Sequence, residues 1–443
     1  MRYVEGAKKV FLATGTRFPH KLIWSVALIK REAAKANASL GRLDPKVASA
    51  VEMAADEVMR GKHDQLISVD VFQTGSGTGL NMNVNELIAE RASAILARPV
   101  HPNDHVNMGQ SSNDVGTSAI RVSAVALCRD ELTPSIERAS KSLRGLARRT
   151  SAVYKAGRTH LRDALPVTMG QEFGAYADAL DHDLRLMRAA ADYSKELPIG
   201  GTAVGTGLNA DPKFGAMVVG GINASTRLGF TVARSRFRAM RLLSDLNALS
   251  SVLSVTSIDV YRLCQDIRLM FSGPLTGLGE IEIPTQEEVA GSSIIPGKTN
   301  PVTVEAAMLA SAQVMGLDRA NQIAGLLGDF ELSMGVPLLG YNIVTQVALL
   351  SEALGRLSSR VLDHVIPNVE RNRVYAESSP ALVTAISPEV GYDKAAKVGA
   401  RVARGLSIRE GLKQLGYTKG EVERILDLRR LVDQGADRRR RAA

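Results

Sequence analysis

The sequence is poor in aromatic residues and almost free of cysteine. Aromatics make up 4% of its 443 residues, so Leu, Val, Ile, Ala and Met have to fill the core. Two cysteines, Cys128 and Cys264, are too few for a disulfide framework or a four-ligand zinc site. Both occur in helical-looking segments, and we interpret them as buried thiols of a protein from the reducing cytoplasm.

Long apolar runs are missing as well. No stretch approaches the roughly 18 uncharged residues that a membrane span requires. The first residues carry Glu5 early and contain only a brief apolar stretch, unlike a signal peptide. We therefore expect a cytoplasmic protein with no membrane partner.

Positive charge is in excess, with a formal net charge of +9 at pH 7. A basic protein can bind nucleic acid, a membrane surface or a small anion. The densest basic run, Arg438 to Arg441, is at the very end, where we expect a solvated, disordered tail. Because no aromatic-plus-basic module of the kind that reads RNA is present, no nucleic-acid partner is predicted.

Heptad patterns are abundant in the sequence. Apolar residues alternate in steps of four and three from Leu242 to Met270. This seam corresponds to roughly 30 residues, or about 45 Å, of helix. Similar patterns occupy 136–146, 173–187 and 343–361. Proline is absent from 213–273, 302–336 and 338–366, so helices can continue there unbroken.

Several helices far longer than the usual length of about 11 residues predict a mainly α bundle. No βαβ rhythm and no run of short alternating strands is visible. Since a helix of about 45 Å is long for packing inside one chain, we expect some seams to pack between subunits.

Five segments lack helical periodicity or are dense in glycine and proline, and chemistry is expected there: 75–79, 99–117, 157–170, 200–207 and 291–301. The first reads Gly75-Ser76-Gly77-Thr78-Gly79, whose backbone N–H groups and hydroxyls could approach an anion. A plain structural turn is the alternative. A nucleotide P-loop is excluded, because no Gly-Lys-Ser/Thr follows.

The second segment combines donors and acceptors. His101, Asp104 and His105 could suggest a metal, but Pro102 disrupts helical spacing and no third partner is apparent, so we predict no metal. The run Ser111-Ser112-Asn113 precedes a helix. It can cap that helix, or its hydroxyls and the free N–H groups can hold a carboxylate.

Two further loops carry reactive side chains. His160 titrates near neutrality when unperturbed and follows the hydroxyl of Thr159, although a lone histidine is more often structural. The loop 291–301 contains hydroxyls and Lys298, and Asn300-Pro301 reads as the cap and first residue of a helix. Such a loop suits a mobile lid that brings a base or nucleophile to an anionic substrate.

The loops together closely resemble the fumarase/aspartase superfamily. GSSIIPGKTNP (291–301) is its most specific motif, and the resemblance extends from about Phe18 to about Tyr417. GSGTGLNMNVNE, HPNDHVN, QSSND, GRTHL and GDFEL look like class II fumarate hydratases in particular. His160 stands where aspartases typically have glutamine.

The resemblance implies an enzyme that reversibly hydrates fumarate to (S)-malate by anti addition of water, through an aci-carboxylate intermediate and without cofactor or metal. It implies three domains, an N-terminal lyase domain 1–109, a long-helix bundle 110–365 and a small helical domain 366–443 that includes the basic tail. The bundle is expected to form a core of twenty helices in a homotetramer, with each active site shared by three subunits.

The resemblance also assigns roles to residues. Ser292 matches the catalytic base, His160 the proton donor that acts through a water, and Glu305 the charge-relay partner of His160. The positions that match substrate-binding residues are Ser76, Gly77, Thr78, Ser111, Ser112, Asn113, Thr159, Ser293, Lys298 and Asn300. A secondary dicarboxylate site, for which a structural role is the alternative, matches Arg98, His101, Asn103 and Asp104.

The sequence departs from the family at Met108-Gly109, which replaces the more usual Lys-Ser and removes a positive charge near the site. An aspartate ammonia-lyase of the same superfamily is the nearest alternative, and His160 argues against it. A non-catalytic, crystallin-like structural protein is the alternative from another class. The presence of Ser292, Glu305 and Lys298 argues for an enzyme.

Overall fold

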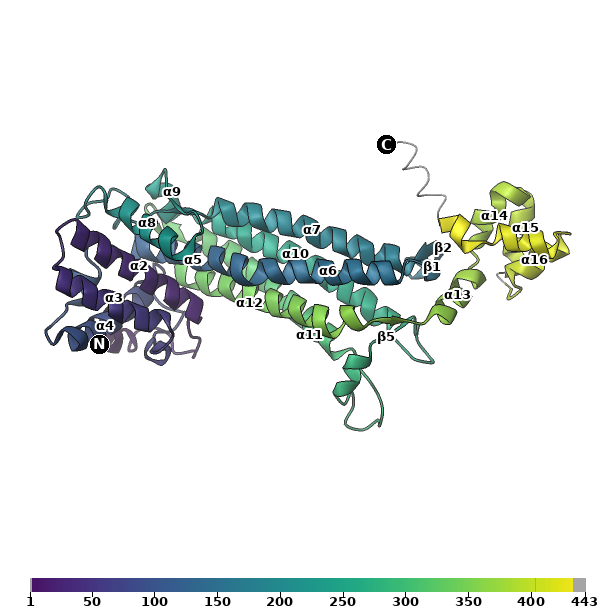
Figure 1. Ribbon diagram of the computed structural model, residues 1–443, viewed down its shortest axis with the longest axis horizontal. Helices are drawn as coiled ribbons and strands as arrows, with labels where there is room; N and C mark the ends of the chain where they lie inside the picture. The colour runs from purple at the N-terminus through teal and green to yellow at the C-terminus, as the bar shows by residue number, and fades with distance from the viewer. Residues whose placement is uncertain (1, 403, 433–443) are drawn as a thin grey trace. The chain divides into compact units, whose positions relative to one another are not determined.

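The computed structural model describes residues 2–402 and 404–432. Helices make up most of it, and the strands are short (Figure 1). The predicted mainly α fold is therefore confirmed. The basic run Arg438 to Arg441, predicted to be a tail, lies outside the described residues.

The chain divides into two compact units, each assembled from three stretches of sequence. The first unit contains 1–136, 182–258 and 309–353, and the second contains 137–181, 259–308 and 354–443. The sequence predicts a different division, into domains at 1–109, 110–365 and 366–443. Those three domains stay a prediction.

Short and medium helices build much of the first unit. They are α1 (Arg2–Ala7), α2 (His20–Ser39), α3 (Pro45–Met59), α4 (Thr78–Leu96), α5 (Ser112–Leu127), α8 (Phe214–Thr226) and α9 (Arg236–Arg241). Short helical turns are η1 (Asp64–Leu66), η2 (Pro102–Val106) and η3 (Cys128–Leu132), and the strand pairs are β3 (Glu196–Leu197) with β4 (Thr231–Val232) and β6 (Gly328–Asp329) with β7 (Leu332–Ser333). Figure 1 shows α2, α3 and α4 side by side.

Five long helices contribute residues to both units: α6 (Thr133–Arg149), α7 (Met169–Tyr193), α10 (Ser244–Met270), α11 (Val302–Leu326) and α12 (Val336–Arg360). The predicted seam from Leu242 to Met270 falls on α10, which has 27 residues. The prediction of long helices is therefore confirmed.

The seams are buried within the single chain. From Leu246 to Met270, every seam residue of α10 is at most 5% exposed, and Leu242, which precedes the helix, is 50% exposed. The seam residues of α6 and α12 are equally buried. The expectation that some of these seams pack between subunits is wrong, because neighbouring helices of the same chain already cover them. Any packing between chains has to use other faces.

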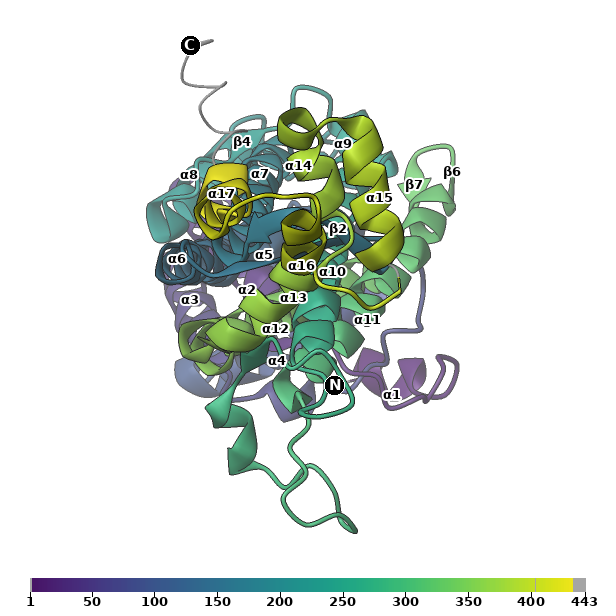
Figure 2. The same cartoon turned by 90° about the vertical axis from the view of Figure 1, so that its right-hand side faces the viewer.

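The second unit carries a hairpin and a set of small helices. Its strands are β1 (Tyr154–Thr159) paired with β2 (Arg162–Thr168), and β5 (Ile281–Glu282) paired with β8 (Ile366–Pro367). Its short helices are η4 (Pro284–Glu288), η5 (Leu362–His364), α13 (Val369–Ser378), α14 (Leu382–Val390), α15 (Tyr392–Val402), α16 (Ile408–Gln414) and α17 (Lys419–Ile425). Figure 2 shows α14, α15 and α16 grouped together. Together with α17 they share a small core that includes Leu382, Val398, Leu412 and Val422.

The two cysteines were predicted to be buried thiols. Cys128 and Cys264 are both free and buried, as predicted. Burial raises the pKa of each thiol to about 12, so both stay protonated and unreactive. Within residues 2–402 and 404–432, no helix combines the length and the apolar character needed to cross a membrane.

A buried ion pair fixes the helix that begins at the second predicted loop. Arg121 of α5 donates from Nε and Nη2 to Asp245 of α10, at 2.7 and 2.9 Å, and neither side chain is exposed to solvent. Arg121 Nη1 donates to the carbonyl oxygens of Thr117 and Ala239. Because the buried charges and their hydrogen bonds are matched, α5 is held rigidly behind its N-terminus.

Removing one partner of this pair should destabilise the fold strongly. We expect Arg121→Met to lower the free energy of unfolding by about 3–5 kcal/mol, because Asp245 stays buried without its cation. Urea denaturation followed by circular dichroism measures the change. The control is Arg138→Met, which breaks the half-exposed pair of Arg138 with Asp363 and should cost about 1 kcal/mol or less. Equal losses in the two variants would contradict this account.

Candidate active site

The residues predicted from the sequence fall into two groups, one in each unit. The first unit contains Ser76, Gly77, Thr78, Ser111, Ser112 and Asn113. The second unit contains Thr159, His160, Ser292, Ser293, Lys298, Asn300 and Glu305. Within each group, the side chains are held by the elements of their own unit.

The glycine-rich loop places hydroxyls at the start of α4. Ser76 Oγ and Thr78 Oγ1 lie 2.8 Å apart in a hydrogen bond. Gly77 precedes the helix in the left-handed region, with φ at 77°. A Cβ on Gly75 would lie 2.3 Å from the carbonyl oxygen of Met334, so only glycine fits there. The loop therefore presents hydroxyls beside the free N–H groups of a helix N-terminus.

The second loop caps α5. Ser111 accepts a hydrogen bond from the N–H of Asn113 at 3.2 Å, while Asp114 accepts one from the N–H of Ser111 at 2.9 Å, which completes a capping box. The capping interpretation is thus confirmed for Ser111. Ser112 Oγ accepts from Asn81 of α4 at 3.2 Å, and Asn113 donates to the carbonyl of Ala203 at 2.8 Å.

Asp114 is the buried centre of this loop. Besides Ser111, it accepts from the N–H groups of Gly200 at 3.0 Å and Thr202 at 2.9 Å. Burial raises the pKa of its carboxyl to about 6, although the backbone donors oppose that shift. Asp114 therefore ties the loop 200–207 to the N-terminus of α5. Sequence analysis included it in the QSSND motif but gave it no role.

His160 lies at the tip of the β1–β2 hairpin. Thr159 pairs with Arg162, and the two residues between them, His160 and Leu161, both have φ at 56°. A tight hairpin turn of this kind usually contains Gly, Asn or Asp, because these residues adopt positive φ at the least cost. Thr159 and His160 are exposed. The hairpin thus holds the predicted proton donor out from the body of its unit.

A buried carboxylate anchors the hairpin. Glu280, which is fully buried just before β5, lies 2.7 Å from Lys155 Nζ and 2.7 Å from Arg158 Nη1, both on β1. Lys155, 2% exposed, also lies 2.8 Å from Glu172 of α7. These pairs fix the strand that ends at Thr159. Sequence reasoning missed them, because Glu280 is more than a hundred residues from β1 and has no local motif.

The loop before α11 is closed at its base. Gly291 donates to the carbonyl of Lys298 at 3.1 Å, and Asn300 Nδ2 donates to the carbonyl of Gly291 at 2.5 Å. Ser292 Oγ accepts from the N–H groups of Ile294 at 3.2 Å and Ile295 at 3.0 Å. The tip is open, since Ile294 is 84% exposed and Ser293 and Lys298 are exposed too.

The predicted relay pair does not meet within one chain. Glu305, in the first turn of α11, is half-exposed, and its carboxylate lies 3.9 Å from Arg268. Among the described residues, no hydrogen bond or ion pair joins Glu305 to His160. The structure therefore places both residues in the second unit without a hydrogen bond or ion pair between them.

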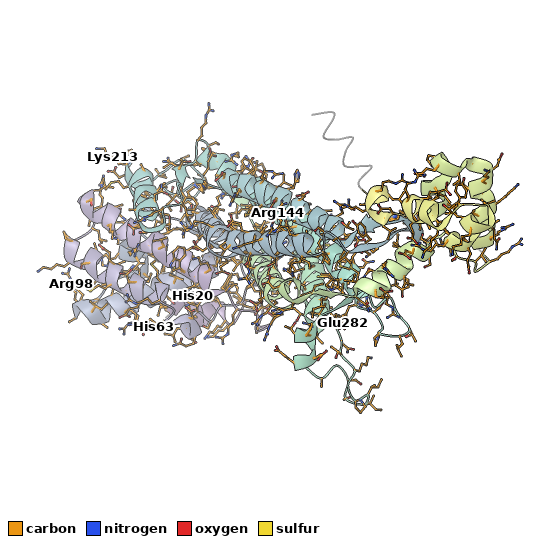
Figure 3. The ribbon with its side chains drawn as sticks, turned by 45° about the vertical axis from the view of Figure 1, so that its right-hand side comes forward. His20, His63, Arg98, Arg144, Lys213 and Glu282 are labelled. Atoms are coloured by element: carbon orange, nitrogen blue, oxygen red, sulfur yellow. The ribbon has the colours of Figure 1, made fainter. Side chains whose placement is uncertain are left out.

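Arg98 and His101 of the predicted secondary site already have polar partners. Arg98, labelled in Figure 3, pairs with Asp44 at the surface. His101 Nδ1 accepts from the N–H groups of Asn103 at 3.3 Å and Asp104 at 3.1 Å, which caps η2. These contacts favour the structural alternative, and the binding role stays a prediction. In the described part of the chain, no cluster of three or more His, Cys, Asp or Glu residues could hold a metal ion.

Comparisons with known proteins identify the family. Residues 1–316 match the family profile described as lyase, and residues 382–433 match that of the fumarase C C-terminus. Fumarate hydratase class II of Saccharolobus solfataricus is 58% identical over 435 residues, which are 98% of this chain and 99% of that protein. The chain belongs to the class II fumarate hydratase family. Its relative of the same name from Nitrosomonas europaea is 41% identical and covers 93% of this chain and 90% of its own length.

Solved structures of fumarases and fumarate lyases have the same fold. A class II fumarase from Schistosoma mansoni superposes with a TM-score of 0.91 at 32% identity, covering 96% of this chain and 93% of its own. A fumarate lyase:delta crystallin from Brucella melitensis, solved bound to cobalt, has a TM-score of 0.91 at 34% identity and covers 97% and 94%. The resemblance to class II fumarate hydratases and the fumarase/aspartase-type fold are therefore confirmed.

The closed base of the 291–300 loop allows a direct test of its geometry. In Gly291→Ala, the new Cβ would lie 2.3 Å from the carbonyl oxygen of Lys298 and 2.7 Å from the N of Asn300, so the base has to open. A displacement of about 1 Å can reduce turnover by about 100-fold, and we expect a loss of that order with unchanged thermal stability.

Initial rates of fumarate hydration and a melting curve check this prediction. Gly220→Ala on α8 is the matched control, because its Cβ meets nothing within 4 Å. Normal turnover in Gly291→Ala would mean that the loop does not need its closed base.

Proposed function

We propose that the chain hydrates fumarate reversibly to (S)-malate by anti addition of water through an aci-carboxylate intermediate. Membership of the class II fumarate hydratases carries this proposal, since the chain matches a curated relative of that name along almost its whole length. A dicarboxylate is accordingly the proposed substrate. Both groups of predicted residues are intact, which supports a catalytic protein over a crystallin-like one.

Removal of a proton from malate requires a strong base, because the carbon next to a carboxylate is a very weak acid. Serine serves only if its alkoxide is stabilised. The N–H groups of Ile294 and Ile295 already donate to Ser292 Oγ, and Lys298 follows on the same loop. These donors support Ser292 as the base, since they would stabilise the negative charge that develops on its oxygen.

The leaving hydroxyl needs an acid on the opposite face of the substrate. We propose His160, acting through a water, with Glu305 as its charge-relay partner. The hairpin that presents His160 is anchored by Glu280. The remaining predicted residues then hold the two carboxylates: Ser76, Gly77, Thr78, Ser111, Ser112, Asn113, Thr159, Ser293, Lys298 and Asn300.

We also propose a homotetramer whose sites each draw residues from three subunits. The separation of His160 from Glu305 within one chain supports shared sites. Five long helices per chain, in four chains, would supply the core of twenty helices. The apolar side chains that α10 and α11 leave exposed support such association: Val255, Ile258, Leu309, Ile323 and Leu326, between 44% and 83% exposed.

Two further proposals have less support. The cytoplasmic location is consistent with free, buried thiols. The secondary dicarboxylate site at Arg98, His101, Asn103 and Asp104 would require the present contacts of Arg98 and His101 to open.

Ser292→Ala tests the base directly. We expect kcat to fall by roughly 10² to 10⁴, the usual scale for loss of a general base, with an unchanged fold because the loop is exposed. The ultraviolet absorbance of fumarate gives the rate. Ser378→Ala, an exposed serine on α13, is the control and should keep full activity. Near-normal turnover of Ser292→Ala would remove this residue from the mechanism.

Mixed tetramers test the shared site. We expect Ser292→Ala and His160→Asn to be inactive alone and to regain activity when refolded together. Suppose that the serine and the histidine of one site come from different chains. In an equal mixture each of the two residues is then intact in about half of the sites, so about a quarter of the sites receive both. No recovery, together with light scattering that reports an active monomer, contradicts the shared site.

A further inference from the structure

A fully buried lysine lies behind the binding residues of the first unit. Lys30 of α2 has no solvent-exposed surface. Its Nζ donates to Asn107 Oδ1 at 2.7 Å and to Gln110 Oε1 at 3.0 Å. Both acceptors are neutral amides in the turn between η2 and α5. The amine therefore has hydrogen-bond partners, but among the residues that the structure describes no carboxylate contacts it directly.

Asn107 also forms hydrogen bonds with helix α4. Its Oδ1 also accepts from Asn81 Nδ2 at 3.3 Å and from Asn85 Nδ2 at 3.2 Å, both on α4. Asn81 Nδ2 in turn donates to Ser112 Oγ at 3.2 Å. A continuous path of hydrogen bonds therefore runs from the ammonium of Lys30 through Asn107 and Asn81 to the hydroxyl at the start of α5.

Burying the amine of Lys30 away from water costs folding free energy. Desolvation lowers the pKa of Lys30 to about 7, and the negative charge of Asp114 opposes that shift. A methionine would fill much of the same space without that cost. Its amine nevertheless contacts two side chains of the turn before α5.

We propose that Lys30 is a positioning residue for substrate binding: its ammonium fixes Asn107, and through Asn107 and Asn81 it orients Ser112 at the N-terminus of α5. This inference rests on the proposed function, in which Ser112 binds a substrate carboxylate. Lys30 touches no substrate itself. Its Nζ matters because it donates to Asn107 and Gln110 together, which fixes the orientation of the Asn107 amide.

Lys30→Met separates positioning from catalysis. We expect KM for both fumarate and malate to rise by about 10- to 100-fold, the scale of a lost hydrogen bond to a charged group. We expect kcat to change by less than about threefold, because loss of binding shared by ground and transition states raises KM alone. An unchanged KM in a folded Lys30→Met protein overturns the proposal.

Lys35→Met is the matched control. Lys35 lies on the same helix, but it is half-exposed and pairs with Glu32 at 3.3 Å and Glu52 at 3.8 Å, away from the Asn107 turn. Its KM and kcat should equal those of the unmodified protein. If neither the unmodified protein nor Lys35→Met hydrates fumarate, the proposed function fails. If the protein is active but KM rises equally in both lysine variants, the positioning role of Lys30 is contradicted and the proposed function stands.

A double-mutant cycle tests the route through Asn107. If Lys30 acts through Asn107, then Lys30→Met combined with Asn107→Leu should raise KM no further than either change alone. If the two changes instead raise KM by factors that multiply, the route through Asn107 is contradicted. If circular dichroism finds Lys30→Met unfolded, Asn81→Ala replaces it, because that change cuts the path before Ser112 and leaves the ammonium paired. A rise in KM of similar size supports the path, and an unchanged KM overturns it.

Discussion

Ionised side chains that are buried must be paired inside the protein, because their transfer out of water costs several kcal/mol. Three buried titratable side chains, each with several hydrogen-bond or ion-pair partners, hold the loops of the candidate site. Asp114 gathers the N–H groups of two loops at the start of α5, and Lys30 holds the turn before that helix. Glu280 holds the strand that ends at Thr159. The proposed binding groups are thus fixed by buried polar side chains behind them, which preorganises donors for an anionic substrate.

The two units carry different parts of the candidate site. The first unit supplies hydroxyls and helix N-termini that suit carboxylates, and the second supplies the proposed base and acid on an exposed loop and an exposed hairpin. Neither unit has a complete set, because the proposed binding residues 76–78 and 111–113 lie in the first unit and the proposed base and acid lie in the second. In the proposed tetramer, the apolar faces of α10 and α11 would be covered by other chains as the sites are completed.

Local patterns in the sequence predicted local structure well. The seam from Leu242 to Met270 became α10, and Ser111 caps α5, because heptads and caps depend on neighbours a few residues away. The prediction that some seams pack between subunits was wrong. An apolar stripe has the same sequence pattern whether helices of its own chain or of another chain cover it. The β1–β2 hairpin was not predicted, because His160-Leu161 lacks the Gly or Asn that marks such turns. Lys30 and Glu280 were missed because their partners are distant in sequence.

As a member of the class II fumarate hydratases, this chain adds water, and not ammonia, to fumarate. The most direct measurement is the ultraviolet absorbance of fumarate after the purified protein is mixed with (S)-malate and, separately, with (S)-aspartate. Fumarate should appear from malate, no fumarate should appear from aspartate, and added fumarate should be consumed until the same equilibrium is reached. Fumarate formed from aspartate, or no change with either substrate, would contradict the account.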